Sequence, residues 1–193
     1  LPRNHIVENE IMIEIRLHGR GGQGAVTSAE LLAQAAIGEG KYAQAFPSFG
    51  PERRGAPVAA FIRVSDTPIR TREKVYTPDV VLVLDHSLPS LVNVSEGLHA
   101  DGIVILNTSL SEAGVRKKFD LKGKLALVDA NTIAMEVIGM PITNTTMLGA
   151  LMKATNLVST DAMNKALEKR FGRIAEKNKA ALKRAYEETV VTG

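Results

Sequence analysis

The chain has 193 residues, of which 45% are hydrophobic and 23% are charged, and it contains no cysteine. A chain of this length and composition is expected to fold around a buried core as one globular domain. No apolar run approaches the ~20 residues that a membrane helix needs, so we expect no membrane association and a cytoplasmic location. Without cysteine, the chain cannot form disulfides or supply thiolate ligands to zinc or an iron–sulfur cluster.

The formal net charge is +3, and it is confined to one end of the chain. Residues 161–193 contain eight Lys/Arg and five Asp/Glu, a difference that accounts for the whole excess. A small excess on a helical tail is not the clustered basic patch that nucleic acid requires. We therefore expect a complementary protein surface as partner and no nucleic acid.

The first third of the chain contains strand and helix patterns in alternation. Residues 1–10 lack the apolar core of a signal peptide, and we expect a disordered or non-native extension there, followed by a single domain over 11–193. A strand is predicted over 12–18, a helix over 25–37 and two further strands over 42–46 and 58–64. The first strand alternates, with Glu14, Arg16 and His18 on its polar face. It should therefore lie at a sheet edge or turn that face toward another subunit.

Three later segments, 80–84, 103–106 and 125–128, are continuous apolar runs of strand length. Such runs are typical of parallel strands that are covered on both faces. Helical patterns separate them over 88–98 and 111–119, and three more follow over 146–156, 161–171 and 175–190. The predicted fold class is α/β: a Rossmann-like, mostly parallel sheet flanked by helices, with a helical C-terminal segment.

The densest glycine segment joins the first strand to the first helix and reads Gly19-Arg20-Gly21-Gly22-Gln23-Gly24. A strand that turns into a helix start presents backbone N–H groups and the helix dipole to an anion. In the functional interpretation this turn binds a phosphate, Gly21 and Gly22 allow close approach, and Gln23 offers its amide. In the alternative, the glycines only supply positive φ angles for a tight turn.

The same segment matches the spacing G-x-G-x-x-G of dinucleotide sites. NAD binding also needs a carboxylate about 20 residues later, at the end of the second strand. That strand ends Ala45-Phe46-Pro47, without an acid, so NAD is disfavoured. NADP stays open, because Arg53 or Arg54 could bind its extra phosphate.

The loop over 46–57 combines three prolines, two glycines, two aromatic residues and an arginine pair. Proline stiffens the loop, while exposed Phe and Arg are enriched at protein contacts. We expect a subunit interface or an active-site closure there, formed by Phe49, Glu52, Arg53 and Arg54.

Polar residues follow the three apolar strands: Asp85, Asn107 and Asp129. Ligands bind at this edge of parallel sheets, but such residues also cap the next helix, which is the interpretation we favour. The contiguous Asp85-His86-Ser87 is not a catalytic triad, because triad members converge from separate segments. No residue is assigned a catalytic role.

The remaining candidate residue types have simpler interpretations. The four histidines show no metal-ligand spacing, so no metal site is predicted. Five methionines are interpreted as core filler of the helical part: Met135, Met140, Met147, Met152 and Met163.

In their order and spacing, five segments resemble the gamma subunits of 2-oxoacid:ferredoxin oxidoreductases, and the likeness runs from about residue 12 to 186. The segments are 18–27, 44–47, 51–57, 78–81 and 143–150. The resemblance implies an enzyme complex that converts a 2-oxoacid and coenzyme A to acyl-CoA, CO2 and reduced ferredoxin.

The resemblance also implies a division of labour within that complex. Thiamine diphosphate, Mg and the 4Fe-4S clusters belong to partner subunits, and ferredoxin is reached through the complex. This chain would support assembly, and the glycine turn would bind coenzyme A phosphates as a hypothesis. A free-standing NADP oxidoreductase and a scaffold without a ligand stay open as alternatives.

Overall fold

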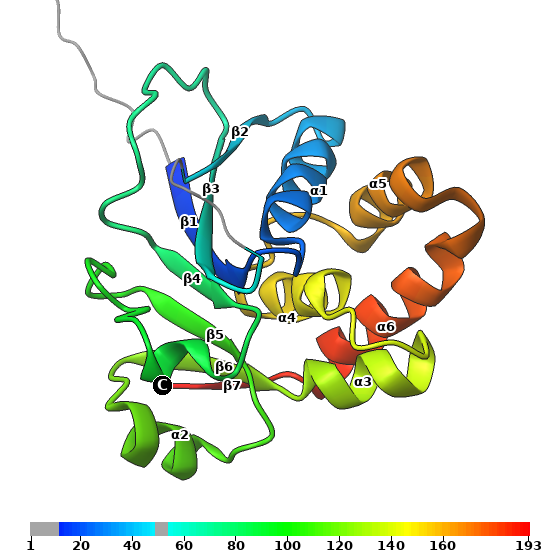
Figure 1. Cartoon of the computed structure of the whole chain (residues 1–193). Coiled ribbons are helices and arrows are strands. Elements are labelled where there is room, and N and C mark those ends of the chain that lie inside the picture. Colours follow the sequence, from blue (N-terminus) through cyan, green and yellow to red (C-terminus); the bar gives the residue numbers. More distant parts are fainter. Residues whose placement is uncertain (1–11, 49–53) are drawn as a thin grey trace, which may run out of the picture.

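The computed structural model describes residues 12–48 and 54–193, and one seven-stranded sheet runs through them (Figure 1). The prediction for residues 1–10 lies outside the described residues. The strands are β1 (Met12–Arg20), β2 (Tyr42–Pro47), β3 (Pro57–Ser65), β4 (Val80–Val83), β5 (Ile103–Asn107), β6 (Lys124–Val128) and β7 (Val190–Thr192). Their spatial order is β2-β3-β1-β4-β5-β6-β7.

The sheet is mixed, with a parallel centre and antiparallel margins. Strands β1, β4, β5 and β6 pair in parallel. Strand β3 is antiparallel to both β1 and β2, and β7 is antiparallel to β6. Five of the seven strands therefore point the same way, and the predicted α/β fold class is confirmed.

Helices cover both faces of the sheet. They are α1 (Ala25–Gly38), α2 (Glu112–Phe119), α3 (Ala130–Val137), α4 (Asn144–Thr155), α5 (Thr160–Phe171) and α6 (Ala175–Glu188). Helix α2 and the irregular segment after β4 lie on one side, while the other five helices gather on the opposite side (Figure 1). Within residues 12–48 and 54–193, no helix is long and apolar enough to cross a membrane.

Each face of the sheet has its own core because β4, β5 and β6 are apolar on both sides, as predicted. One core packs alternate strand residues such as Ile15, Leu82 and Ile105 against α1, α4, α5 and α6. The second packs residues such as Val83 and Leu106 against α2 and the segment after β4.

The structure corrects the predicted position of the first strand. Strand β1 is not at an edge, since β3 and β4 flank it. Its polar face is covered by this chain's own segment after β4, whose Val94 and Glu96 carbonyls accept hydrogen bonds from Arg16. The neighbouring polar residue Glu14 pairs with the buried Arg63 at 2.6 Å. A second subunit is therefore not needed to satisfy these charges.

The predicted helix over 88–98 is wrong. Only a 3-10 turn, η1 (Leu88–Ser90), forms there, and the chain runs irregularly to β5. Gly97 adopts a φ of 68°, and a Cβ at this position would collide with the Tyr76 carbonyl. Close backbone packing between two loops therefore replaces the helix that the apolar spacing suggested.

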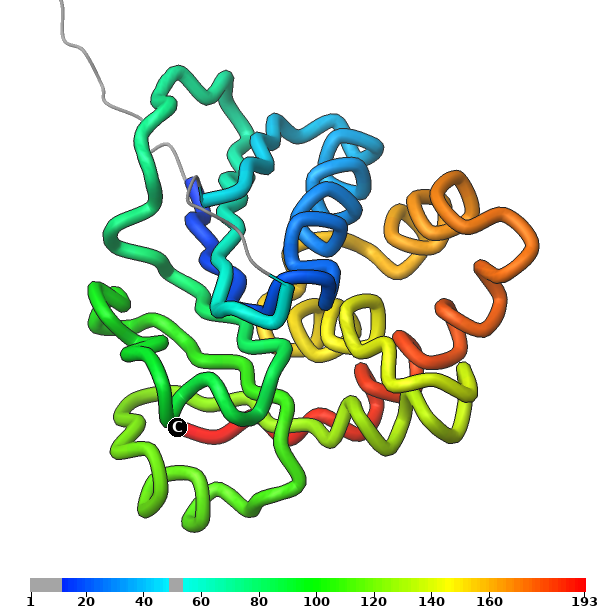
Figure 2. The backbone as a smooth tube through the Cα atoms, in the orientation of Figure 1, coloured from blue at the N-terminus to red at the C-terminus, as the bar shows by residue number. Residues whose placement is uncertain are grey.

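The end of the chain also differs from the prediction. Helix α6 stops at Glu188, and Val190–Thr192 forms β7 at the sheet edge beside β6. Figure 2 shows the C-terminal segment returning to the sheet. Three successive β-branched residues favour a strand over another helical turn.

The methionine prediction is right for three residues and wrong for two. Met147, Met152 and Met163 are buried, as expected of core filler. Met135 and Met140 are 51% and 53% exposed, because they lie on the outer side of α3 and on the loop after it.

Helices α4 and α6 cross in close contact at Gly149. A Cβ on Gly149 would collide with the backbone carbonyl of Leu182. Near the crossing, the Thr145 hydroxyl donates to the Asn178 side chain at 2.7 Å. Glycine at this position therefore lets the two helix backbones approach each other.

We predict that Gly149→Ala lowers the free energy of unfolding by about 1–3 kcal/mol, because the extra methyl group must push the helices apart. Urea unfolding measures the effect. Gly38→Ala is the matched control, since its Cβ would meet nothing within 4 Å and it also lies in a helix. Equal stability of the two variants would contradict close packing at Gly149.

Candidate functional site

The glycine turn leads from the carboxyl end of β1 into α1. Gly22 has a φ of 91°, and Gly24 has a φ of 83° at the residue that precedes the helix. A Cβ on Gly24 would lie 2.6 Å from the Asn144 side-chain nitrogen at the start of α4. These two glycines therefore supply positive φ angles, as the turn interpretation predicts, and Gly24 also permits close packing.

The turn lies where the order of the strands reverses direction. From β1 the chain passes through α1 and β2 to β3 on one side, whereas β4 pairs with β1 on the other side. Such a switch point opens a crevice at the carboxyl ends of the strands, where α/β proteins bind ligands. The fold thus places the glycine turn at the position most typical of a binding site.

Two segments that the sequence singled out separately lie together. The Gly21 N–H donates to the Ala56 carbonyl at 2.9 Å, and the Gly55 N–H donates to the Gly21 carbonyl at 3.2 Å. The Arg20 guanidinium also donates to the Gly55 carbonyl at 3.0 Å. The glycine turn and the end of the arginine loop are therefore one structural unit.

Arg54 is exposed next to this junction, where it adds positive charge. The other residues predicted for the arginine loop, Phe49, Glu52 and Arg53, lie outside the described residues. The interface or closure role of this loop therefore stays a prediction.

Both polar side chains of the turn bind the carboxylate of Asp85, which follows β4. Arg20 Nε lies 3.2 Å and Gln23 Nε2 lies 2.7 Å from Asp85 Oδ2. Gln23 Oε1 also accepts the backbone N–H of Arg20 at 2.7 Å. Both ends of the Gln23 side-chain amide are thus hydrogen-bonded in this structure: the oxygen bonds within the turn, and the nitrogen bonds to Asp85.

Asp85 is a site residue whose role the sequence interpretation missed. Burial alone would raise the pKa of its carboxyl group, but hydrogen bonds from Ser87 and Gln23 and the charge of Arg20 lower that pKa below its ordinary value. The cap interpretation holds instead for Asp129, which accepts the Thr132 N–H at 3.0 Å. Only the pairing of β1 with β4 reveals the role of Asp85.

Asn107, the third residue predicted at the strand ends, is buried at the end of β5 and contacts the residue after β4 and the start of α3. Its side chain donates to the Leu84 carbonyl at 2.8 Å and accepts the Ala130 N–H at 3.0 Å. This asparagine therefore braces the carboxyl edge beside the glycine turn.

The turn is electrostatically suited to an anion. Within the part of the chain that the structure describes, the amides of Gly22 and Gly24 have no hydrogen-bond acceptor. The first turn of α1 contains no acidic residue. Free amides at a helix N-terminus attract phosphate and carboxylate groups.

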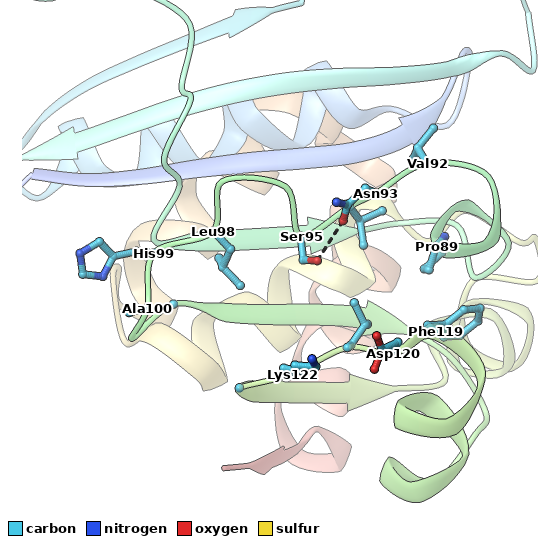
Figure 3. A pocket seen from close by; sticks show the side chains of 14 residues that line it. Pro89, Val92, Asn93, Ser95, Leu98, His99, Ala100, Phe119, Asp120 and Lys122 are labelled. Atoms are coloured by element: carbon cyan, nitrogen blue, oxygen red, sulfur yellow. Dashed lines mark hydrogen bonds between the residues drawn. The ribbon is translucent and has the colours of Figure 1, made fainter.

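A second cleft, of about 490 Å³, lies between the segment after β4 and the end of α2 (Figure 3). It lies near the amino ends of β5 and β6, at the opposite edge of the sheet from the glycine turn. Figure 3 shows His99 pointing away from Asp120 and Lys122, so these polar groups do not converge. The described residues also contain no group of three or more side chains that could hold a metal ion.

Fold and site together define the protein as an α/β domain with a glycine-rich strand-to-helix turn at its switch point. Comparison with known proteins then identifies its family. Residues 14–188 match the family described as pyruvate ferredoxin/flavodoxin oxidoreductase. The chain belongs to this family.

Named relatives agree with the family match. The chain is 57% identical, over 93% of its length and 98% of the relative's, to "Pyruvate/ketoisovalerate oxidoreductases common subunit gamma" of Thermococcus kodakarensis. It is 44% identical to the crystal structure of pyruvate oxidoreductase subunit PORC of Thermotoga maritima, with a TM-score of 0.84 over 94% of this chain and 99% of that one. The resemblance to gamma subunits is confirmed.

A more distant structure shares the fold alone. It is a 2-oxoglutarate:ferredoxin oxidoreductase from Magnetococcus marinus with 2-oxoglutarate, coenzyme A and succinyl-CoA bound. The identity is 19% and the TM-score is 0.70, and the match covers 91% of this chain and 30% of that one. The gamma-type fold therefore also occurs as one part of a longer polypeptide.

His18 lies directly before the turn, half-buried, and is neutral at pH 7. Burial and the neighbouring Arg16 lower its pKa from 6.5 to about 4, although the Val94 carbonyl favours the charged form. Its Nε2 atom accepts a hydrogen bond from Arg16 Nε at 3.0 Å. A proton on Nε2 would abolish this bond and place two cations side by side.

We predict that His18 makes the fold sensitive to acid. Between pH 6.5 and about 4 the unfolded chain binds a proton that the folded chain does not, so stability falls as the pH decreases through this range. The full loss is roughly 3 kcal/mol. Urea unfolding at several pH values tests this, with His18→Gln as the comparison. An equal pH dependence in both proteins would contradict the prediction.

Proposed function

We propose that this chain works as the gamma subunit of a 2-oxoacid:ferredoxin oxidoreductase complex. The complex would decarboxylate pyruvate or a branched-chain 2-oxoacid oxidatively and form acyl-CoA, CO2 and reduced ferredoxin. The family match over residues 14–188 and the high identity to gamma subunits support this proposal. A cytoplasmic location, as expected from the sequence, is part of the same proposal.

The partners in this proposal are the other subunits of the complex, and ferredoxin reaches the chain only through them. Thiamine diphosphate, Mg and the 4Fe-4S clusters belong to those subunits. The complete lack of cysteine in this chain supports that division, because such clusters are held by cysteine thiolates.

Within the complex, we propose that the glycine turn binds the phosphates of coenzyme A. The observation that carries this proposal is the position of the Gly22 and Gly24 amides at the start of α1 and at the switch point of the sheet. These N–H groups would donate to phosphate oxygens while the α1 dipole adds a favourable potential. Arg54 would add a positive charge at the rim, and Arg20 would keep the turn in place.

The arginine loop, with Phe49, Glu52, Arg53 and Arg54, would dock a partner subunit or close over the bound coenzyme. Its end is hydrogen-bonded to the glycine turn through Gly55 and Ala56, so movement of the loop would be transmitted to the turn. This connection supports a role for the loop in coenzyme binding.

The proposal predicts that Gly22→Val raises the KM for coenzyme A at least tenfold in the assembled complex, because the side chain would shield the turn amides from the phosphates. The KM for the 2-oxoacid should stay unchanged. Steady-state kinetics measure both constants.

Gly40→Val is the matched control for this substitution. Gly40 also has a positive φ and open space around its Cβ position, but it lies in the turn between α1 and β2. An unchanged KM for coenzyme A in the Gly22 variant would refute the phosphate site.

A second prediction concerns the arginine loop. We expect Arg53→Ala/Arg54→Ala to weaken assembly or to reduce turnover, because guanidinium groups bind carboxylates and phosphates in a bidentate geometry. Gel filtration and turnover measurements test these effects, with the exposed Lys117→Ala/Lys118→Ala on α2 as control. Normal assembly together with normal turnover would disprove a role for the arginine pair.

The alternative of an NADP site remains testable on the same protein. The spacing of the glycines and the exposed Arg54 beside the turn favour it. A bound ligand raises the apparent melting temperature in a saturable way. Stabilisation by NADPH but not by coenzyme A would support the alternative, and no response to either ligand would favour a scaffold.

A further inference from the structure

The two non-glycine residues of the glycine turn, Arg20 and Gln23, both donate side-chain hydrogen bonds to one carboxylate. This carboxylate belongs to Asp85, at the end of the neighbouring strand. We propose that Asp85 is a positioning residue that orients the turn amides toward a bound phosphate. The inference rests on the proposed function, since it concerns the same coenzyme A site.

Asp85 accepts hydrogen bonds on both of its oxygens. Arg20 and Gln23 donate to Oδ2 at 3.2 Å and 2.7 Å, while the Ser87 N–H donates to Oδ1 at 2.9 Å and the Ser87 hydroxyl also bonds to Oδ1. The Arg20 guanidinium donates in addition to the Ser87 hydroxyl at 2.7 Å. Four donors thus converge on one group, and only an ionised carboxylate accepts on both oxygens without donating.

The contact is transmitted to the backbone through Gln23. Its Oε1 accepts the Arg20 N–H at 2.7 Å, and its own backbone N–H donates to the Arg20 carbonyl at 2.9 Å. The Gln23 side chain therefore closes the turn around Gly21 and Gly22, and Asp85 keeps the Gln23 amide in the required orientation. The direction of the Gly22 N–H depends on this arrangement.

The charge of Asp85 does not oppose an anion at the turn. Its Oδ2 forms an ion pair with the guanidinium of Arg20, and the side chain is largely buried. The pair adds little net charge beside the glycine turn. The free amides and Arg54 therefore determine the local potential.

A purely structural role for Asp85 is the simplest alternative. Strands β1 and β4 are already joined by their parallel ladder, and the Leu84 N–H donates to the His18 carbonyl at 2.8 Å just before Asp85. The sheet therefore does not need the carboxylate to hold these strands together. A structural brace would affect stability without a selective effect on coenzyme A.

The test uses the assembled complex with Asp85→Asn. An asparagine has one acceptor oxygen, so its NH2 group must face either the donors of Arg20 and Gln23 or the Ser87 N–H, and one of these sets loses its acceptor. We expect the KM for coenzyme A to rise roughly tenfold, with kcat changed less than about twofold and the KM for the 2-oxoacid unchanged. Hydrogen exchange of the amides over 19–25 should become faster.

A second substitution provides a rescue that only this geometry predicts. In Asp85→Asn/Gln23→Glu the donor and the acceptor of the hydrogen bond between positions 23 and 85 exchange places. The amide introduced at position 85 donates to the carboxylate introduced at position 23, and that carboxylate still accepts the Arg20 N–H. We expect the double variant to recover most of the coenzyme A affinity and the slow exchange. Asp129→Asn is the control, since Asp129 caps α3 without touching the turn and asparagine also caps helices.

The outcomes separate this inference from the proposed function. Unchanged coenzyme A kinetics and exchange in Asp85→Asn, alongside a raised KM in Gly22→Val, would overturn the role of Asp85 and leave the phosphate site standing. Unchanged kinetics in both variants would overturn both proposals. If Asp85→Asn prevents assembly, recovery in the double variant supports the inference and continued failure overturns it.

Discussion

The parallel pairing of β1 with β4 is the constraint on which the site depends. It brings the ends of two strands that are more than 60 residues apart in the sequence to the same edge of the sheet. The glycine turn follows one strand and Asp85 follows the other, so their hydrogen bonds exist only because of this register. The same pairing places the glycine turn at the switch point of the sheet, the position where α/β proteins typically bind ligands.

A buried polar layer behind the turn supports the same region. Arg16 joins His18 to the carbonyls of the segment after β4, while the Glu14–Arg63 pair connects β1 to β3. Burying charges is costly unless they are paired and hydrogen-bonded, and most of these groups meet that condition. The central strand is thus tied to its neighbours through side chains as well as through the sheet ladder.

Glycine has two distinct uses in this protein. In the turn, Gly22 and Gly24 provide positive φ angles, and their amides have no hydrogen-bond acceptor among residues 12–48 and 54–193. At Gly149, the lack of a side chain lets α4 and α6 touch, which packs the helical layer against the sheet. Both uses depend on the absence of a side chain, in the turn for backbone conformation and at Gly149 for close packing.

Periodicity and composition alone determined the α/β class, the parallel centre of the sheet and the glycine turn between the first strand and the first helix, because these follow from local patterns of apolar residues and glycine. Tertiary structure decided the rest. The alternation of β1 suggested an edge strand, but its charges are satisfied by a distant loop; residues 88–98 suggested a helix, but loop packing at Gly97 prevents it. Asp85 resembled a helix cap, and only strand order made it a partner of Arg20 and Gln23, since sequence spacing does not encode which strands become neighbours.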